Sequence, residues 1–219
     1  MRTVWSILSY RRYYGPAHTA GAALLCAAAF YLQFSSRAEL TVETPLRVGH
    51  TFTAMLAHRT PFHLWSNLLP LVVLGWFVES LHGPVRAAAL FWIGGSFGAL
   101  AHAGRAAPGS TFAGCSPAVY AYMGAMAAHL IVNWTEVAAR YAWLVAIALT
   151  VAAEVAAATL GWSPTVSYTS HAAGLVMGTV LGAAVLKNPV QVSWERALRE
   201  VCLALAGRGY GLVLRWGPC

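Results

Sequence analysis

Long apolar blocks alternate with shorter polar segments along most of the chain. Each block holds roughly 18–22 residues, the length at which an α-helix crosses a hydrocarbon core of about 30 Å. Prolines stand at or just before several block starts, where a helix tolerates proline's missing N–H. The six blocks are residues 17–34, 62–81, 86–104, 116–134, 141–161 and 168–187. This pattern predicts an all-α, polytopic membrane bundle of six transmembrane helices.

The segments outside these blocks suggest the domain organisation. We expect residues 1–15 to form a cytoplasmic N-terminal segment and residues 16–188 to form one membrane domain. Residues 189–219 carry several charged side chains, which are costly inside a bilayer. This tail fits either an interfacial amphipathic helix or a degenerate seventh span, and the sequence leaves both open.

Composition and charge agree with a membrane protein. The chain has 219 residues, of which 58% are hydrophobic and 10% are charged, whereas a soluble domain carries about 25% charged residues. The net charge of +7 does not indicate nucleic acid, because the basic residues lie mostly at block ends. With six spans, ten of the 14 Lys and Arg residues fall on the side of the N-terminus. This bias predicts a multi-pass protein with a cytoplasmic N-terminus. We expect its membrane to be that of the secretory pathway or the plasma membrane.

Five polar residues occupy matching positions in three of the blocks. His63 and Asn67 open the second block, Ser116 and Tyr120 open the fourth, and His171 lies near the start of the sixth. With six spans, these three blocks all run from the outside inward. We therefore expect the five side chains to lie at a similar depth, near the outer leaflet. Polar groups inside a bilayer are costly, and so each is a candidate for function.

These residue types suit nucleophilic catalysis. A serine hydroxyl becomes a good nucleophile when a nearby histidine takes its proton, so Ser116 and His171 form a candidate pair. The free N–H groups at a helix start suit a developing oxyanion, to which His63 and Asn67 would add donors. Tyr120 is placed to pack on the His171 ring. Alone, Ser116 also suits a helix cap and His171 also suits a packing role; the joint pattern favours catalysis.

The remaining ionisable residues in the blocks have other interpretations. The chain contains no aspartate, and of its seven glutamates Glu154 alone lies well inside a block. We therefore predict a serine–histidine dyad, with Glu154 as a neutral carboxyl bonded to a neighbouring helix. Other ionisable residues in or beside the blocks fit structural or interfacial roles better than catalytic ones: His58, His82, His102, His129 and Glu79. The four cysteines have no metal-ligand or paired spacing.

Several motifs in the chain resemble those of the rhomboid family of intramembrane serine proteases. The segment from His58 through His63 to Asn67 fits that family's HxxxxHxxxN element, and Gly114-Cys115-Ser116 fits the region around its nucleophile. His171 with glycines three and seven residues later is similar to the sixth span of the animal secretase-type branch.

This resemblance implies a function and roles for named residues. Ser116 would be the nucleophile and His171 the base, while His63, Asn67 and the backbone N–H groups near Ser116 would line the oxyanion site. Gly114 and His58 belong to the supporting motifs. The resemblance also implies no metal or cofactor, and substrates that are single-span membrane proteins cut within or near their transmembrane helix.

Several positions depart from the family pattern, among them Ser170, which stands where alanine usually precedes the histidine. Pro117 stands where GxSG has its last glycine, and Gly49-His50 replaces the usual Trp-Arg pair of the first loop. These departures leave open a rhomboid-like pseudoprotease that binds membrane clients without cleaving them. A small transporter or channel is a third interpretation, although the inner half of the spans carries little charge.

Overall fold

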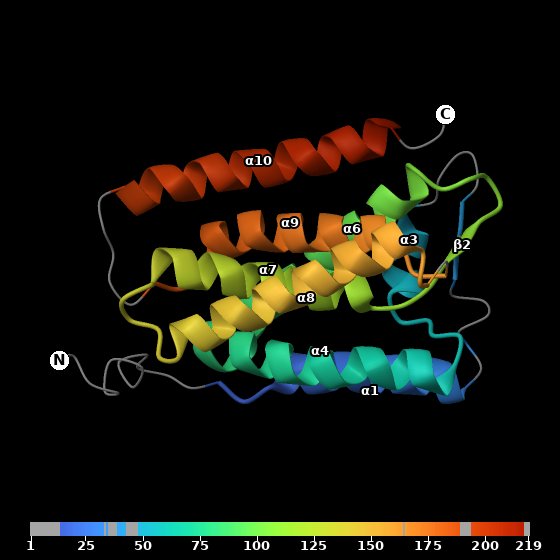
Figure 1. Cartoon of the computed structure of the whole chain (residues 1–219), viewed down its shortest axis with the longest axis horizontal. Coiled ribbons are helices and arrows are strands. Elements are labelled where there is room, and N and C mark those ends of the chain that lie inside the picture. The colour runs from blue at the N-terminus through green and yellow to red at the C-terminus, as the bar shows by residue number, and fades with distance from the viewer. Residues whose placement is uncertain are drawn as a thin grey trace.

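The computed structural model describes residues 14–32, 34, 39–42, 48–163, 165–188 and 194–216 (Figure 1). The predicted N-terminal segment, residues 1–15, lies almost wholly outside this part. The larger helices are α1 (Ala17–Tyr31), α4 (Pro61–His82), α7 (Ser116–Val132), α8 (Arg140–Leu160), α9 (Tyr168–Val185) and α10 (Trp194–Trp216). A further helical run consists of α5 (Pro84–Ala89), a π-helical turn at Leu90–Gly94 and α6 (Gly95–Ala103), and a short helix, α3, spans Gly49–Ala54.

Each of the six apolar blocks coincides with one of these helical segments to within a few residues. Within the part of the chain that the structure describes, three segments are long and apolar enough to cross a membrane: Pro61–His82, Pro84–Ala103 and Arg140–Leu160. Helices α1 and α7 are apolar but shorter. The helical architecture is therefore confirmed, whereas the count of six membrane crossings stays a prediction.

A small sheet departs from the predicted all-α fold. Strand β1 (Leu40–Thr41) pairs antiparallel with β2 (Thr111–Phe112), so that Leu40 faces Phe112 in the register. Such a short pair has no visible signal in the sequence, because the two strands come from segments about 70 residues apart that meet only in the folded chain. The pair ties the segment after α1 to the segment before α7.

Glycines bring α7 and α9 into close contact at the centre of the bundle. A Cβ atom on Gly174 would lie 2.3 Å from the carbonyl oxygen of Pro117, and one on Gly178 would lie 2.1 Å from that of Ala121. Only glycine permits so close an approach of two backbones, and such spacing of small residues is typical of helices packed in lipid. This contact sets the start of α9 beside the start of α7.

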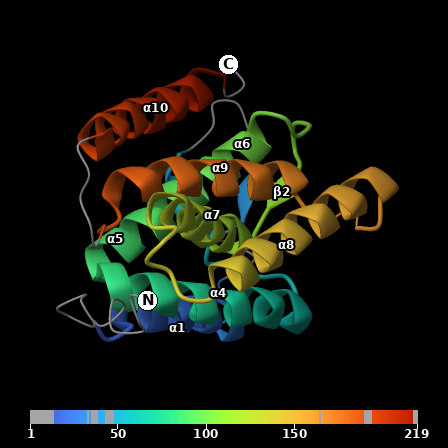
Figure 2. The same ribbon diagram turned by 60° about the vertical axis from the view of Figure 1, so that its left-hand side comes forward.

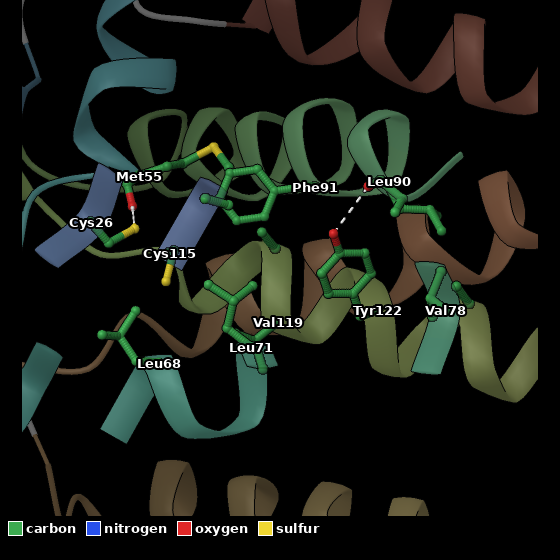
Figure 3. Packing of buried hydrophobic residues seen from close by; sticks show 14 of the residues in the cluster. Cys26, Met55, Leu68, Leu71, Val78, Leu90, Phe91, Cys115, Val119 and Tyr122 are labelled. Atoms are coloured by element: carbon green, nitrogen blue, oxygen red, sulfur yellow. Dashed lines mark hydrogen bonds between the residues drawn. The ribbon is translucent and has the colours of Figure 1, made fainter. Parts of the chain in front are cut away.

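The apolar core lies between α1, α4, α7 and the run α5–α6 (Figure 3). Tyr122 is fully buried there, and its hydroxyl donates a hydrogen bond of 3.1 Å to the carbonyl oxygen of Ala87. Glu79 is also fully buried and accepts hydrogen bonds from the N–H groups of His18 and Thr19 and from the Thr19 hydroxyl. Glu79 thereby joins α4 to the first turn of α1, which is a structural role.

Two helices lie at the outside of the bundle. None of the residues of α8 is buried, and one end of this helix projects beyond its neighbours (Figure 2). Helix α10 lies along α9 and α6, where the Tyr210 hydroxyl is hydrogen-bonded to that of Ser96. The tail predicted for residues 189–219 is thus helical over Trp194–Trp216, and whether it spans the membrane stays open.

Candidate active site

The starts of α4, α7 and α9 lie at the same end of the bundle, on the right in Figure 1. Ser116 is the first residue of α7, and the N-cap of this helix is Cys115. The cap therefore lies one residue earlier than it would if Ser116 were a capping serine. The Ser116 hydroxyl is turned toward α9 instead, where it meets His171.

A chain of short contacts joins three side chains from three helices. Ser116 Oγ lies 2.9 Å from His171 Nε2, and His171 Nδ1 lies 2.8 Å from Glu154 Oε2. The His171 side chain is 12% exposed and that of Glu154 is 29% exposed. Both distances are those of good hydrogen bonds. The sequence predicted that Glu154 bonds to a neighbouring helix, but not that its partner there is His171.

The ring of Tyr120 fixes one face of the His171 imidazole. The two ring centroids are 4.3 Å apart and the planes differ by 13°, which is a stacked arrangement. Tyr120 and Ser116 lie four residues apart on α7, on one helical face. Tyr168 approaches His171 edge-on, with centroids 6.4 Å apart. The stacked pair restricts rotation of the imidazole about the contact with Ser116.

Gly114 lets His63 approach the loop before Ser116. The backbone of Gly114 has φ +120°, and a Cβ atom there would lie 2.8 Å from His63 Nε2. A side chain at this position would therefore be strained and would also displace the His63 ring. The Gly114 N–H donates a hydrogen bond of 2.9 Å to the carbonyl oxygen of Ala54, which anchors the loop to α3.

Asn67 and His58 are held by contacts other than Ser116. Asn67 is buried, and its side-chain N–H donates a hydrogen bond of 2.7 Å to the carbonyl oxygen of His63. His58 is buried beside Cys115, with Nε2 at 3.7 Å from the Cys115 Sγ and Nδ1 at 3.2 Å from the Leu56 carbonyl oxygen. Burial, together with the neighbouring His63, lowers the pKa of His58 to about 4. His58 thus supports the loop as a neutral side chain.

Pro117 fits the space that its neighbours provide. It is buried, and a Cβ atom on Gly98 would lie 2.5 Å from the Pro117 Cβ. Gly174 packs against the Pro117 backbone from the other side. The proline ring therefore occupies room left by glycines on α6 and α9, and the Ser116–His171 contact is formed with Pro117 in place.

The three linked side chains have the arrangement needed for acyl transfer. In such a site the serine attacks a carbonyl, the histidine takes the serine proton, and a third group orients the histidine. Among the described residues, no group of three or more His, Cys, Asp or Glu side chains is placed to hold a metal ion.

Comparison with known proteins gives a consistent set of relatives. The rhomboid domain family matches residues 45–188 of the chain. RHOMBOID-like protein 1 of Arabidopsis thaliana is 32% identical over 142 residues, which are 65% of this chain and 36% of that protein. Rhomboid-related protein 1 of Caenorhabditis elegans is 28% identical over 156 residues, covering 69% of this chain and 44% of that protein.

A fungal relative is also similar. Rhomboid-type serine protease 2 of Emericella nidulans is 27% identical over 146 residues, which are 67% of this chain and 27% of that protein. In all three comparisons the chain spans less than half the length of the relative. These plant, nematode and fungal relatives leave the animal secretase-type branch a prediction.

Proposed function

This chain belongs to the rhomboid family, and on that basis we propose that it is an intramembrane serine endopeptidase. Its substrates are single-span membrane proteins, cleaved within or near their transmembrane helix. The observation that carries this proposal is the 2.9 Å contact between Ser116 Oγ and His171 Nε2, formed at one end of a bundle of apolar helices. The fungal relative whose name describes a serine protease supports the same reaction class.

The reaction proceeds in two acyl-transfer steps. Ser116 Oγ forms a bond to the carbonyl carbon of the scissile peptide, the carbonyl π electrons move to oxygen, and the hydroxyl proton passes to His171 Nε2. The C–N bond then breaks, and the leaving amine takes the proton from Nε2. A water molecule, losing its proton to the same nitrogen, attacks the acyl carbon, and Ser116 Oγ leaves and recovers that proton.

The oxyanion of the tetrahedral intermediate is stabilised beside the start of α7. N–H groups in the first turn of a helix have no partner within the helix and favour a negative charge. His63 lies against the loop that precedes Ser116, and its ring N–H is a second donor. Asn67 is the third, once its amide is released from the His63 carbonyl that it bonds now.

The site faces the non-cytoplasmic side of the membrane in this proposal. The excess of Lys and Arg on the side of the N-terminus supports a cytoplasmic N-terminus. The active site then lies at the outer end of the bundle, in the secretory pathway or at the plasma membrane. A substrate helix reaches it from the surrounding lipid, and neither metal nor cofactor takes part.

Cleavage of a reporter substrate tests the proposal. The protein is reconstituted in liposomes with single-span reporters of different transmembrane sequence, beside Ser116→Ala and the matched control Ser110→Ala, which removes an exposed loop hydroxyl bonded to Ala107. We expect cleavage by the wild type and the control, and none by Ser116→Ala. Equal cleavage by Ser116→Ala, or binding of reporters without cleavage by the wild type, contradicts the proposal, and the second result identifies a pseudoprotease.

A further inference from the structure

The contact between Glu154 and His171 goes beyond a serine–histidine dyad. Glu154 Oε2 lies 2.8 Å from His171 Nδ1, on the side of the imidazole opposite to Ser116. We propose that Glu154 is a positioning residue: its carboxylate holds the His171 ring in the tautomer and orientation that accept the Ser116 proton. This inference rests on the proposed function, because it concerns the same base.

The direction of the hydrogen bond decides what His171 can do. When a carboxylate accepts the Nδ1–H, the ring is a neutral donor at Nδ1 and Nε2 is free to accept the Ser116 proton. A neutral carboxyl that donated its O–H to Nδ1 would leave the proton on Nε2, where it would face the serine. Only the first arrangement makes His171 a base toward Ser116. The sequence-based expectation of a neutral carboxyl thus conflicts with the proposed role of His171.

The position of Glu154 on α8 is otherwise hard to explain. A carboxyl group within an apolar span is costly unless it has a partner. Thr150 and Thr159 hydrogen-bond to carbonyl oxygens of α8 itself, whereas Glu154 reaches across to α9. Because no residue of α8 is buried, close packing of this helix does not account for the position of the Glu154 side chain. The contact with His171 gives the Glu154 carboxylate a hydrogen-bond partner and explains why an acidic residue stands in this apolar helix.

Tyr120 completes the surroundings of the acid and the base. Its ring is stacked on His171, and its side chain also interacts with Glu154. The imidazole is therefore held at its face by Tyr120, at Nδ1 by Glu154 and at Nε2 by Ser116. When His171 takes the serine proton, the new positive charge lies beside the Glu154 carboxylate. A nucleophile, a base and an orienting acid arranged in this way recur on unrelated folds and are recognised by geometry.

Steady-state kinetics of reporter cleavage test the role of Glu154. Glu154→Gln keeps the size of the side chain and removes the negative charge, whereas Glu154→Asp keeps the charge on a shorter side chain. Glu136→Gln is the matched control, because the Glu136 carboxylate accepts an exposed hydrogen bond of 3.3 Å from the hydroxyl of the adjacent Thr135. We expect kcat to fall about 10- to 100-fold in Glu154→Gln with little change in KM, and Asp to recover part of the loss. An unchanged kcat in Glu154→Gln, or a change confined to KM, overturns the proposal.

Thermal unfolding of each variant guards against a purely structural effect. If Glu154→Gln fails to fold, Glu154→Asp takes its place: its shorter side chain lengthens the Nδ1 contact, and kcat should fall by roughly 5- to 10-fold. An Asp variant as fast as the wild type would overturn the proposal.

A substrate-independent assay separates this inference from the proposed function. The rate at which a fluorophosphonate modifies Ser116 depends on the base and not on any membrane substrate. If the wild type cleaves no reporter but is modified at Ser116, the proposed function fails while slower modification of Glu154→Gln still supports the role of Glu154. Equal rates of modification in both proteins contradict that role. A wild type that is not modified at all overturns both proposals.

Discussion

The substitution Gly174→Ala tests whether close packing of α7 and α9 positions the base. The added Cβ would lie 2.3 Å from the carbonyl oxygen of Pro117 and 3.0 Å from its carbonyl carbon, whereas ordinary contacts begin at 3.4 Å. Both nearest atoms belong to the backbone, so no side chain can move aside. The two helices must separate locally by about 1 Å, and misplacement of a catalytic group by this distance costs on the order of 100-fold in rate.

The separation acts directly on the catalytic pair. Gly174 lies three residues after His171, and Pro117 directly follows Ser116. A shift of about 1 Å would lengthen the 2.9 Å contact to beyond hydrogen-bonding range. Overpacking of this kind also lowers the free energy of unfolding by about 1–3 kcal/mol. We therefore expect a folded, less stable protein with a rate reduced on the order of 100-fold.

The assay compares reporter cleavage and thermal unfolding of Gly174→Ala with those of Gly21→Ala. Gly21 lies in α1, and a Cβ there would have no atom within 4 Å, so this control makes the same change without a clash. The control should keep full activity and gain slightly in stability, since alanine favours a helix by about 1 kcal/mol over glycine. If Gly174→Ala cleaves as fast as the control, the glycine contact does not position His171.

Three further predictions concern other contacts. Burial lowers the pKa of His58 to about 4 in the folded protein, against 6.5 in the unfolded chain, so the unfolded chain binds the proton more readily. The free energy of unfolding should therefore fall by up to about 3 kcal/mol as the pH drops from 6.5 to 4. Chemical unfolding at a series of pH values should show a smaller fall in His58→Gln. Glu79→Gln should lower the free energy of unfolding by about 2–3 kcal/mol, because the glutamine amide cannot accept all three hydrogen bonds that the Glu79 carboxylate accepts. Thermal unfolding measures this change, and unchanged stability would contradict the prediction. Tyr120→Leu should lower kcat by about 2- to 10-fold through loss of the ring stacked on His171, while Tyr120→Phe should keep most of the rate; equal rates in the two variants would show that stacking contributes nothing.

The sequence predicts much of the helical architecture because lipid imposes a simple rule. Apolar blocks of the right length become helices, and the structure places a helical segment at each of the six blocks. Glycines spaced four apart are likewise typical of close helix contact in lipid, and Gly174 and Gly178 make that contact with α7. Both signals are local, so they can be read without knowing the fold.

Contacts between distant segments could not be predicted in the same way. Helix α8 is apolar around Glu154, so its sequence shows that Glu154 needs a partner but does not indicate which helix supplies it. The sequence thus identified Glu154 as unusual but not as the partner of His171, 17 residues later. The contact of His58 with Cys115 joins residues 57 positions apart and depends on the loop conformation that Gly114 permits.

Modification of Ser116 by a fluorophosphonate is the measurement that tests the central claim most directly. The serine oxygen displaces fluoride from phosphorus and His171 takes the serine proton, so the reaction requires the pair of side chains and no substrate. Mass spectrometry of the wild type should find one adduct, on Ser116, and His171→Ala should lose it while remaining folded. An unmodified wild type, or equal modification of His171→Ala, would contradict the assignment of Ser116 and His171 as nucleophile and base.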